Sequence, residues 1–228
     1  YVFHESGTLV SGIIGGLYSS TATISVLARK SRKASEQEAT DYVAAMLLAV
    51  SMMFLRFMIL ILIFSREIFL SIYPYLLTMA VVAAIVAWFI HSRQKRPEDQ
   101  SAETEEDDSS NPLEFKVALI FAVLFVIFTF LTHYTLVYAG TGGLNLLSFV
   151  SGFSDITPFI LNLLQNTGSV AALIITACSM QAIISNIMVN MFYALFFAGK
   201  GSKLRPWILG GFGVVIACNL VLLLFFYI

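Results

Sequence analysis

One acidic residue, Asp155, lies in an otherwise almost wholly apolar stretch, in the sequence GFSDITP, where Ser154 and Thr157 flank it. An ionisable side chain at the depth of a membrane is costly unless it is paired or functional, so Asp155 is a candidate site. Pro158 follows, and we expect it to loosen the helix, because proline lacks a backbone donor and frees a carbonyl upstream. These oxygens predict a position that attracts a cation.

Other polar side chains lie within apolar segments and could complete such a site. Arg56 lies more than a turn from either end of its segment, while Asn186 and Asn190 share one helical face at i, i+4. Three alternatives stay open for Asp155: an ion pair with Arg56 that fixes how helices dock, a site for a permeating species, or a lipid-facing position unrelated to either. The hydroxyls that could line it come from the first apolar segment: Ser19, Ser20, Thr21 and Thr23.

Catalysis and cofactor binding are not predicted. Intramembrane aspartyl proteolysis needs two carboxylates that share a proton, and Asp155 has no second acid beside it. The chain carries no phosphate loop, nucleophile elbow or zinc motif, so we predict no catalytic residue, no metal and no cofactor. Cys178 and Cys218 both fall in apolar runs, where we interpret them as small buried residues.

The composition indicates the class of protein that must position these residues. Hydrophobic residues make up 58% of the chain and charged residues 12%, roughly half the ~25% typical of a soluble domain. Apolar runs of about 20 residues recur, the length that a helix needs to cross a bilayer. The sequence therefore predicts an all-α, polytopic membrane protein that crosses its membrane several times. As a separate expectation, we place it in the inner (plasma) membrane of a prokaryote. The net charge of −1 argues against a nucleic-acid partner.

About seven transmembrane segments are predicted, with an acidic linker at residues 92–112 that cannot bury enough surface to fold. The segments are residues 8–28, 42–64, 68–91, 114–137, 145–164, 170–197 and 206–228. Basic residues at the ends of the first and third segments predict that those ends are cytoplasmic. If every segment crosses the membrane, the remaining basic cluster lies on the opposite side: Lys200, Lys203 and Arg205.

An internal repeat is visible in the sequence. Residues 7–21, GTLVSGIIGGLYSST, match residues 143–157, GLNLLSFVSGFSDIT, at a constant offset of 136, which pairs Ser19 with Asp155. Four spans in each unit would be an even number, so we predict two parallel repeats. The first covers residues 1–91, with its opening helix upstream, and the second covers residues 113–228.

A second match supports the same repeat. SMMFLRFM, residues 51–58, aligns with SNIMVNMF, residues 185–192, which pairs Arg56 with Asn190. Within the first repeat, Gly12 and Gly16 form a small-xxx-small pair, a pattern that lets helix backbones approach closely in lipid.

These motifs resemble a known membrane family. GGLYSSTATISVLARKSRK, MFLR, NPLE, SGFSDI and SNIMVN are similar to the family called domain of unknown function 4010. The resemblance implies an upstream MgtC/SapB-type domain in the same protein. Members of that family often carry a second acid two residues after the position of Asp155. This chain has Thr157 there, so the resemblance does not support a site with two carboxylates.

The function predicted from these residues is transport. We expect a channel or transporter for a small ion or solute, with a cation favoured, whose site lies between the two repeats. The alternative is a non-conducting membrane scaffold or regulatory protein that binds another membrane protein. The expected partners are the lipid bilayer, the small ion or solute, the upstream domain of the same protein and a second copy of the chain.

Overall fold

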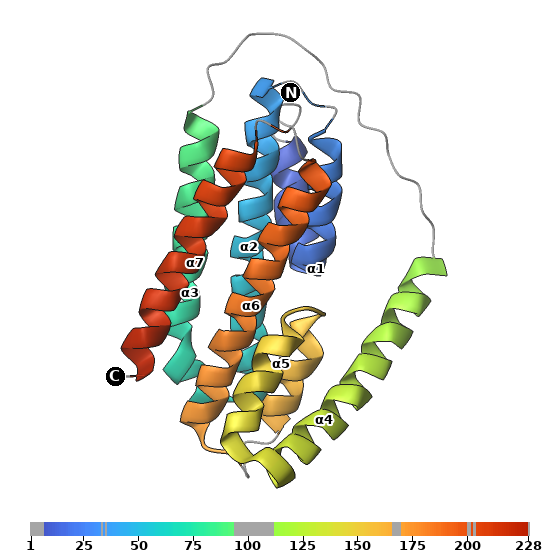
Figure 1. Cartoon of the computed structure of the whole chain (residues 1–228), viewed down its shortest axis with the longest axis vertical. Coiled ribbons are helices and arrows are strands. Elements are labelled where there is room, and N and C mark those ends of the chain that lie inside the picture. Colours follow the sequence, from blue (N-terminus) through green and yellow to red (C-terminus); the bar gives the residue numbers. More distant parts are fainter. Residues whose placement is uncertain are drawn as a thin grey trace. The chain divides into compact units, whose positions relative to one another are not determined.

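The computed structural model describes residues 7–32, 34, 36–93, 112–165, 170–199, 202 and 204–227 (Figure 1). Across these residues the chain is helical and contains no strand. The helices are α1 (Gly7–Lys30), α2 (Glu36–Phe64), α3 (Arg66–Ser92), α4 (Pro112–Ser151), α5 (Ile156–Gln165), α6 (Ala172–Ala198) and α7 (Arg205–Tyr227).

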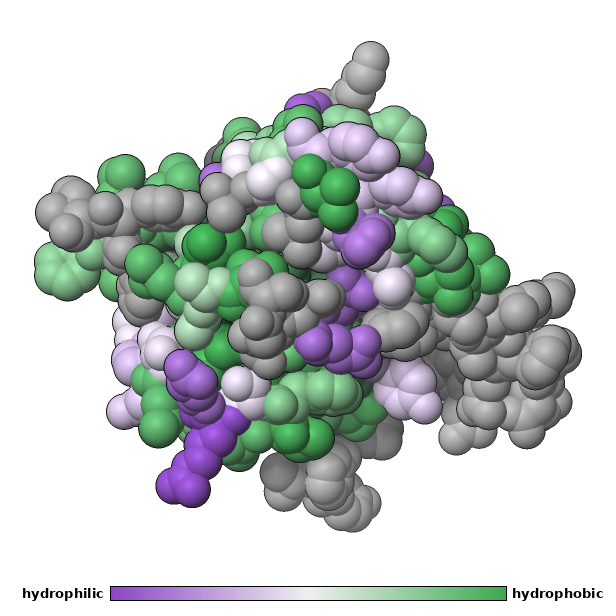
Figure 2. Space-filling view, turned by 90° about the horizontal axis from the view of Figure 1, so that it is seen from below, coloured by the Kyte–Doolittle hydropathy of each residue, from purple (hydrophilic) through white to green (hydrophobic). Residues whose placement is uncertain are grey.

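Five helices, α1, α2, α3, α6 and α7, are long and apolar enough to cross a membrane, as in a multi-pass membrane protein. Large apolar side chains such as Ile63, Trp88 and Phe225 are exposed, as lipid-facing residues are. On the face shown in Figure 2, hydrophobic residues cover much of the described surface, and hydrophilic residues gather in patches between them. The predicted helical membrane class is therefore confirmed. The fifth predicted segment is not one continuous helix, because it is divided between the end of α4 and α5.

The chain forms two compact units. Unit 1 contains Tyr1–Glu98 and Asn186–Ile228, and unit 2 contains Asp99–Ser185, so that α6 belongs to both. The repeat boundaries predicted from the sequence stay a prediction, and most of the predicted acidic linker lies outside the described residues.

In unit 1, α2 packs against α1 and α3, and α7 packs against α2 and α3. Helices α2 and α3 are joined by a single extended residue, Ser65 (φ −153°, ψ 106°). Its side chain caps α3 by accepting a hydrogen bond from the backbone N–H of Ile68 at 3.4 Å. The two helices are antiparallel, since the Ser51 hydroxyl near the middle of α2 donates to the carbonyl of Ala80 in α3 at 2.8 Å.

A buried hydrogen bond joins α3 to α7. The hydroxyl of Tyr75 donates to Oδ1 of Asn219, whose own amide group donates to the Val215 carbonyl at 2.9 Å. Both side chains are almost wholly buried, so each polar group needs its partner.

The end of α6 lies beside the end of α1. The Arg32 guanidinium donates to the carbonyls of Phe197 and of Phe196, the latter at 3.1 Å, and the Arg29 guanidinium lies 4.3 Å from the Phe197 ring centroid. Gly199 ends α6 with φ +91°, a conformation that favours glycine. The basic residue that begins α7, Arg205, follows this turn. The prediction that it lies opposite the basic end of α1 is therefore wrong; Lys200 and Lys203 lie outside the described residues.

In unit 2, helix α4 reverses direction at Gly140, whose positive φ of 57° an L side chain rarely adopts. A Cβ atom added to Gly143 would lie 2.6 Å from the side chain of Thr135, eight residues earlier. Residues eight apart in a straight helix are separated by about 12 Å along its axis. The last ten residues of α4, Gly142–Ser151, therefore run back along the preceding part of the helix.

Candidate functional site

Helix α1 is broken at Ser19, one of the predicted site residues. Its backbone is extended (φ −156°, ψ 108°), and its hydroxyl accepts a hydrogen bond from the backbone N–H of Ala22 at 3.3 Å. Nearly the same dihedral angles and the same i+3 cap occur at Ser65, where antiparallel helices α2 and α3 meet. The shared geometry indicates that α1 also turns back on itself.

A close approach across the break confirms this reversal. A Cβ atom added to Gly15 would lie 2.5 Å from the Oγ1 atom and 3.3 Å from the Cβ atom of Thr23, eight residues later and symmetric about Ser19. In a straight helix these residues would be about 12 Å apart. The two arms of α1 lie side by side in Figure 1. We call α1 hairpin 1 and its turn, Tyr18 and Ser19, tip 1.

The first arm of hairpin 1 packs on α2 through two glycines. A Cβ atom added to Gly12 would lie 2.3 Å from the carbonyl oxygen of Ala45, and one added to Gly16 would lie 2.5 Å from the Cα atom of Ala49. Both contacts are to backbone, which confirms the close packing predicted from the Gly12/Gly16 pair. The contact residue on α2 moves from Ala45 to Ala49 as the residue on α1 moves from Gly12 to Gly16, so this arm runs parallel to α2.

Arg56 of α2 is bonded to tip 1. Its Nη1 atom donates to the carbonyl oxygen of Tyr18 at 2.7 Å. The break at Ser19 leaves this carbonyl without its place in a continuous helix, and such a group must be satisfied within a membrane. The guanidinium carbon also lies 5.2 Å from the Phe57 ring centroid, and the electron-rich ring face attracts the positive charge of Arg56. Two of the predicted site residues, Arg56 and Ser19, thus lie at the same break.

The other predicted hydroxyls of α1 follow tip 1. Ser20 is buried, and Thr21 and Thr23 are half-buried. The Thr21 carbonyl accepts from the hydroxyl of Ser25 at 2.8 Å, and the Thr23 side chain fills the space beside Gly15. Ser20 thus lies next to the break, and Thr23 lies between the two arms of α1.

Asp155 lies at a second break, between Gly142–Ser151 and α5. Helix α4 ends at Ser151, and residues 152–155 form a turn that we call tip 2. The carboxylate oxygen Oδ1 of Asp155 accepts from the backbone N–H of Thr157 at 2.9 Å and from the Thr157 hydroxyl at 2.7 Å. Asp155 is exposed. The predicted segment 145–164 placed Asp155 within one continuous helix, and this is wrong, because Asp155 caps the N-terminus of the next helix.

The role predicted for Pro158 is also corrected. Pro158 is the third residue of α5, in the first turn, where backbone N–H groups have no partner within the helix. A proline is tolerated there and displaces no hydrogen bond. The break precedes Pro158, and the half-buried Ser154 belongs to it through a hydrogen bond from its hydroxyl to the carbonyl of Ser151 at 3.1 Å.

The two ten-residue arms on either side of tip 2 form a second hairpin, residues 142–165, which we call hairpin 2. Its first arm runs parallel to α6, since Asn145 accepts from Cys178 at 3.6 Å and the Phe149 carbonyl accepts from Ser185 at 2.6 Å. Its second arm, α5, lies on α4, where Asn162 donates to Thr129 at 2.8 Å. The paired yellow helices in Figure 1 show these arms.

The two asparagines of α6 are bonded to each other. The Asn190 amide donates to Oδ1 of Asn186 at 3.1 Å, and both side chains are buried. The other oxygen, Oδ1 of Asn190, has no hydrogen-bond partner within the described part of the chain. Arg56 and these asparagines belong to unit 1 and Asp155 to unit 2, so a pairing of Asp155 with Arg56 stays a prediction.

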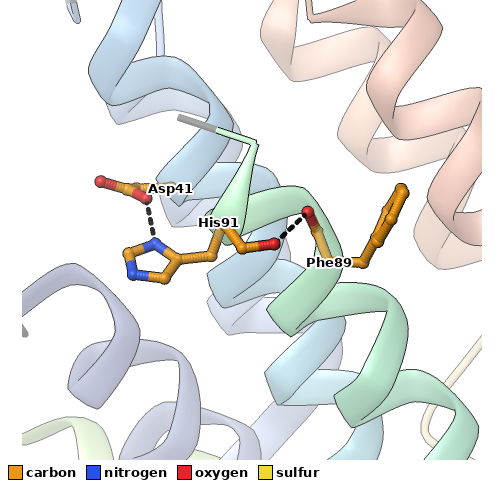
Figure 3. Close-up of polar contacts among 4 residues, drawn as sticks. Asp41, Phe89 and His91 are labelled. Atoms are coloured by element: carbon orange, nitrogen blue, oxygen red, sulfur yellow. Dashed lines mark hydrogen bonds and ion pairs between the residues drawn. The ribbon is translucent and has the colours of Figure 1, made fainter. Parts of the chain in front are cut away.

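Two features of these sites were missed by the sequence reasoning. Ser19 and Asp155 are helix N-caps, and serine and aspartate are residues that prefer this position, so their types were a usable signal. The second missed feature is a polar contact at the basic end of unit 1. There, Nδ1 of His91 lies within hydrogen-bond distance, 2.7 Å, of the Asp41 carboxylate, and the contact joins α3 to α2 (Figure 3). Its two residues are 50 positions apart, and nothing in their spacing points to the contact.

Comparisons with known proteins give a family but no activity. The family described as "Domain of unknown function (DUF4010)" matches residues 1–198. An "Uncharacterized protein" of Aquifex aeolicus (strain VF5) is 25% identical over 227 residues, covering 97% of this chain and 96% of that protein. No solved structure matches.

Proposed function

The chain belongs to the family of the domain of unknown function DUF4010, and on that premise we propose that it transports a small ion or solute across a membrane. It acts as a channel or a transporter in the plasma membrane of a prokaryote. The MgtC/SapB-type partner domain implied by the resemblance stays an expectation.

The observation that carries this proposal is the pair of broken hairpins. Each arm has about 10 to 12 residues, a length of about 15 to 18 Å, which is roughly half of the ~30 Å hydrocarbon thickness. Backbone that is not helical is tolerated at this depth only where protein buries it or where it lines a polar cavity. Discontinuous helices of this kind supply the substrate and ion sites of many transporters.

The charges at the two tips favour an ion as the permeating species. Asp155 is the only acidic residue with a described side chain that lies in a tip; the others, Asp41 and Glu67, lie near helix ends. Its oxygen Oδ1 accepts from Thr157, and the side chain as a whole is exposed. An exposed carboxylate at tip 2 supports the preference for a cation. Tip 1 carries the opposite charge, because Arg56 is bonded to it.

The repeat extends this proposal. The N-caps of the two hairpins, Ser19 and Asp155, are separated by the same 136 residues that relate the matching sequences. Each cap begins a half-helix after a break in an apolar segment. We propose that hairpins 1 and 2 are corresponding elements of two repeats, and that the permeating species passes at the level of their tips.

A scaffold function is the weaker candidate. Its basis is the small-residue faces, which could bind another membrane protein. In unit 1 that face is already covered, because Gly12 and Gly16 contact Ala45 and Ala49 of the same chain. The small residues of α1 therefore have a role inside the protein.

The test is ion flux into proteoliposomes that contain the purified full chain, measured for Na⁺, K⁺, Mg²⁺ and Cl⁻. We expect flux of one cation in the wild type and its loss in Asp155→Asn, which keeps the capping oxygen and removes the charge. Glu67→Gln, which removes an exposed acid at the turn between α2 and α3, is the matched control and keeps flux. Absence of flux in the wild type for all four ions, or equal flux in Asp155→Asn, would contradict the proposal.

A further inference from the structure

We infer that hairpins 1 and 2 enter the membrane from opposite sides, so that the two repeats are inverted rather than parallel. The inference goes beyond transport as such, because it fixes the membrane side from which each tip is approached. It follows from contacts inside each unit and from helix α6, which runs through both.

The open end of hairpin 1 lies on the basic side of unit 1. Both of its arms have their outer ends there, because α1 ends at Lys30 and is followed by the start of α2. The Arg32 contacts with Phe196 and Phe197 place the end of α6 at this same side. The contact of His91 with Asp41 places the end of α3 on this side as well.

Helix α6 connects this side to the other one. It has 27 residues without a break, a length of about 40 Å, which exceeds the ~30 Å of hydrocarbon. Since α6 ends on the basic side, it begins on the opposite side.

The open end of hairpin 2 lies where α6 begins. Its first arm runs parallel to α6, and Asn145 near the start of that arm contacts Cys178 in the second turn of α6. Its second arm ends at Gln165, seven residues before the start of α6 at Ala172. The 28 helical residues of α4 before Gly140 are enough to cross the membrane once.

Two consequences for the topology follow from this inference. A hairpin that enters and leaves on one side contributes no crossing, so the second repeat crosses three times, through α4, α6 and α7. An odd number of crossings inverts the second repeat relative to the first, whereas parallel repeats require an even number. The basic ends of α1, α3 and α6–α7 then share one side, which the excess of arginine and lysine marks as cytoplasmic.

The test is labelling of single cysteines in intact cells with a membrane-impermeant maleimide, in the full chain carrying Cys178→Ser and Cys218→Ser. The positions are Ala34, after hairpin 1; Ser202, after α6; Ser65, between α2 and α3; and Ala171, before α6. We expect Ser65→Cys and Ala171→Cys to react in intact cells, and Ala34→Cys and Ser202→Cys to react only after permeabilisation. Labelling in detergent normalises the reactivity of each position.

The decisive pair is Ala34 and Ser202. If every apolar segment crossed the membrane, as the sequence alone predicts, these two positions would lie on opposite sides and only one would react in intact cells. That result would overturn the inference. Because labelling requires no transport, its outcome is separate from that of the flux measurement.

Discussion

The packing of hairpin 1 on α2 gives a prediction whose size follows from the structure. In Gly16→Ala, the new methyl carbon would lie 2.5 Å from the Cα atom and 2.8 Å from the carbonyl oxygen of Ala49. Carbon atoms in contact prefer about 3.5 to 4.0 Å, so the arm must move by roughly 1 Å. Backbone atoms cannot rotate away as a side chain can. Overpacking of this kind costs about 1 to 3 kcal/mol.

The matched control is Gly213→Ala in α7, where an added Cβ atom meets nothing within 4 Å. Alanine is favoured over glycine inside a helix by roughly 0.5 to 1 kcal/mol, so this variant should be as stable as the wild type or more so. The assay is thermal unfolding in detergent, followed by tryptophan fluorescence. A loss of about 1 to 3 kcal/mol lowers the Tm by roughly 2 to 12 °C in a chain of this size.

A double variant tests the cause of the loss. Ala49→Gly removes the Ala49 Cβ atom, which lies 3.0 Å from the new methyl carbon, but leaves the two closer backbone contacts in place. Gly16→Ala/Ala49→Gly should therefore recover little of the lost stability. If Gly16→Ala unfolds at the same temperature as Gly213→Ala, or if Ala49→Gly restores it fully, the close backbone packing of hairpin 1 on α2 is refuted.

Three further predictions concern polar groups. Arg56→Met should destabilise the protein by about 1.5 to 3 kcal/mol, because it removes a charged donor from the Tyr18 carbonyl; Arg56→Lys should recover part of this in the same unfolding assay. Asp155→Asn should keep the wild-type Tm, since asparagine caps helices as well as aspartate, whereas Asp155→Ala should lose about 1 kcal/mol; a large loss in Asp155→Asn would instead indicate an ion pair. Tyr75→Phe should cost about 1 to 3 kcal/mol by leaving Oδ1 of Asn219 buried without its donor, and Tyr75→Phe/Asn219→Leu should be more stable than the sum of the single changes predicts.

Much of the local structure could be predicted from the sequence because it depends on neighbours in the chain. The apolar runs identified most of the helices to within a few residues, and the Gly12/Gly16 spacing identified a backbone contact. The residue types at Ser19 and Asp155 indicate two helix N-caps, since serine and aspartate are preferred at that position. Sequence reasoning places both residues along continuous helices instead, because an apolar run of about 20 residues is ordinarily one span.

Hydrophobicity alone cannot distinguish a helix that crosses a membrane from two half-helices that enter and leave on the same side. Both bury the same apolar side chains in lipid, and the break in hairpin 1 requires a single extended residue, Ser19. What decides between them is contact across the turn and between distant segments: Thr23 beside Gly15, Arg56 on the Tyr18 carbonyl, and Arg32 at the end of α6. The sequence by itself determined that this chain is a helical membrane protein and which residues break its apolar runs. Only the tertiary structure decided that the chain reverses at those breaks, because the reversal is stabilised by residues that the sequence does not show to be in contact.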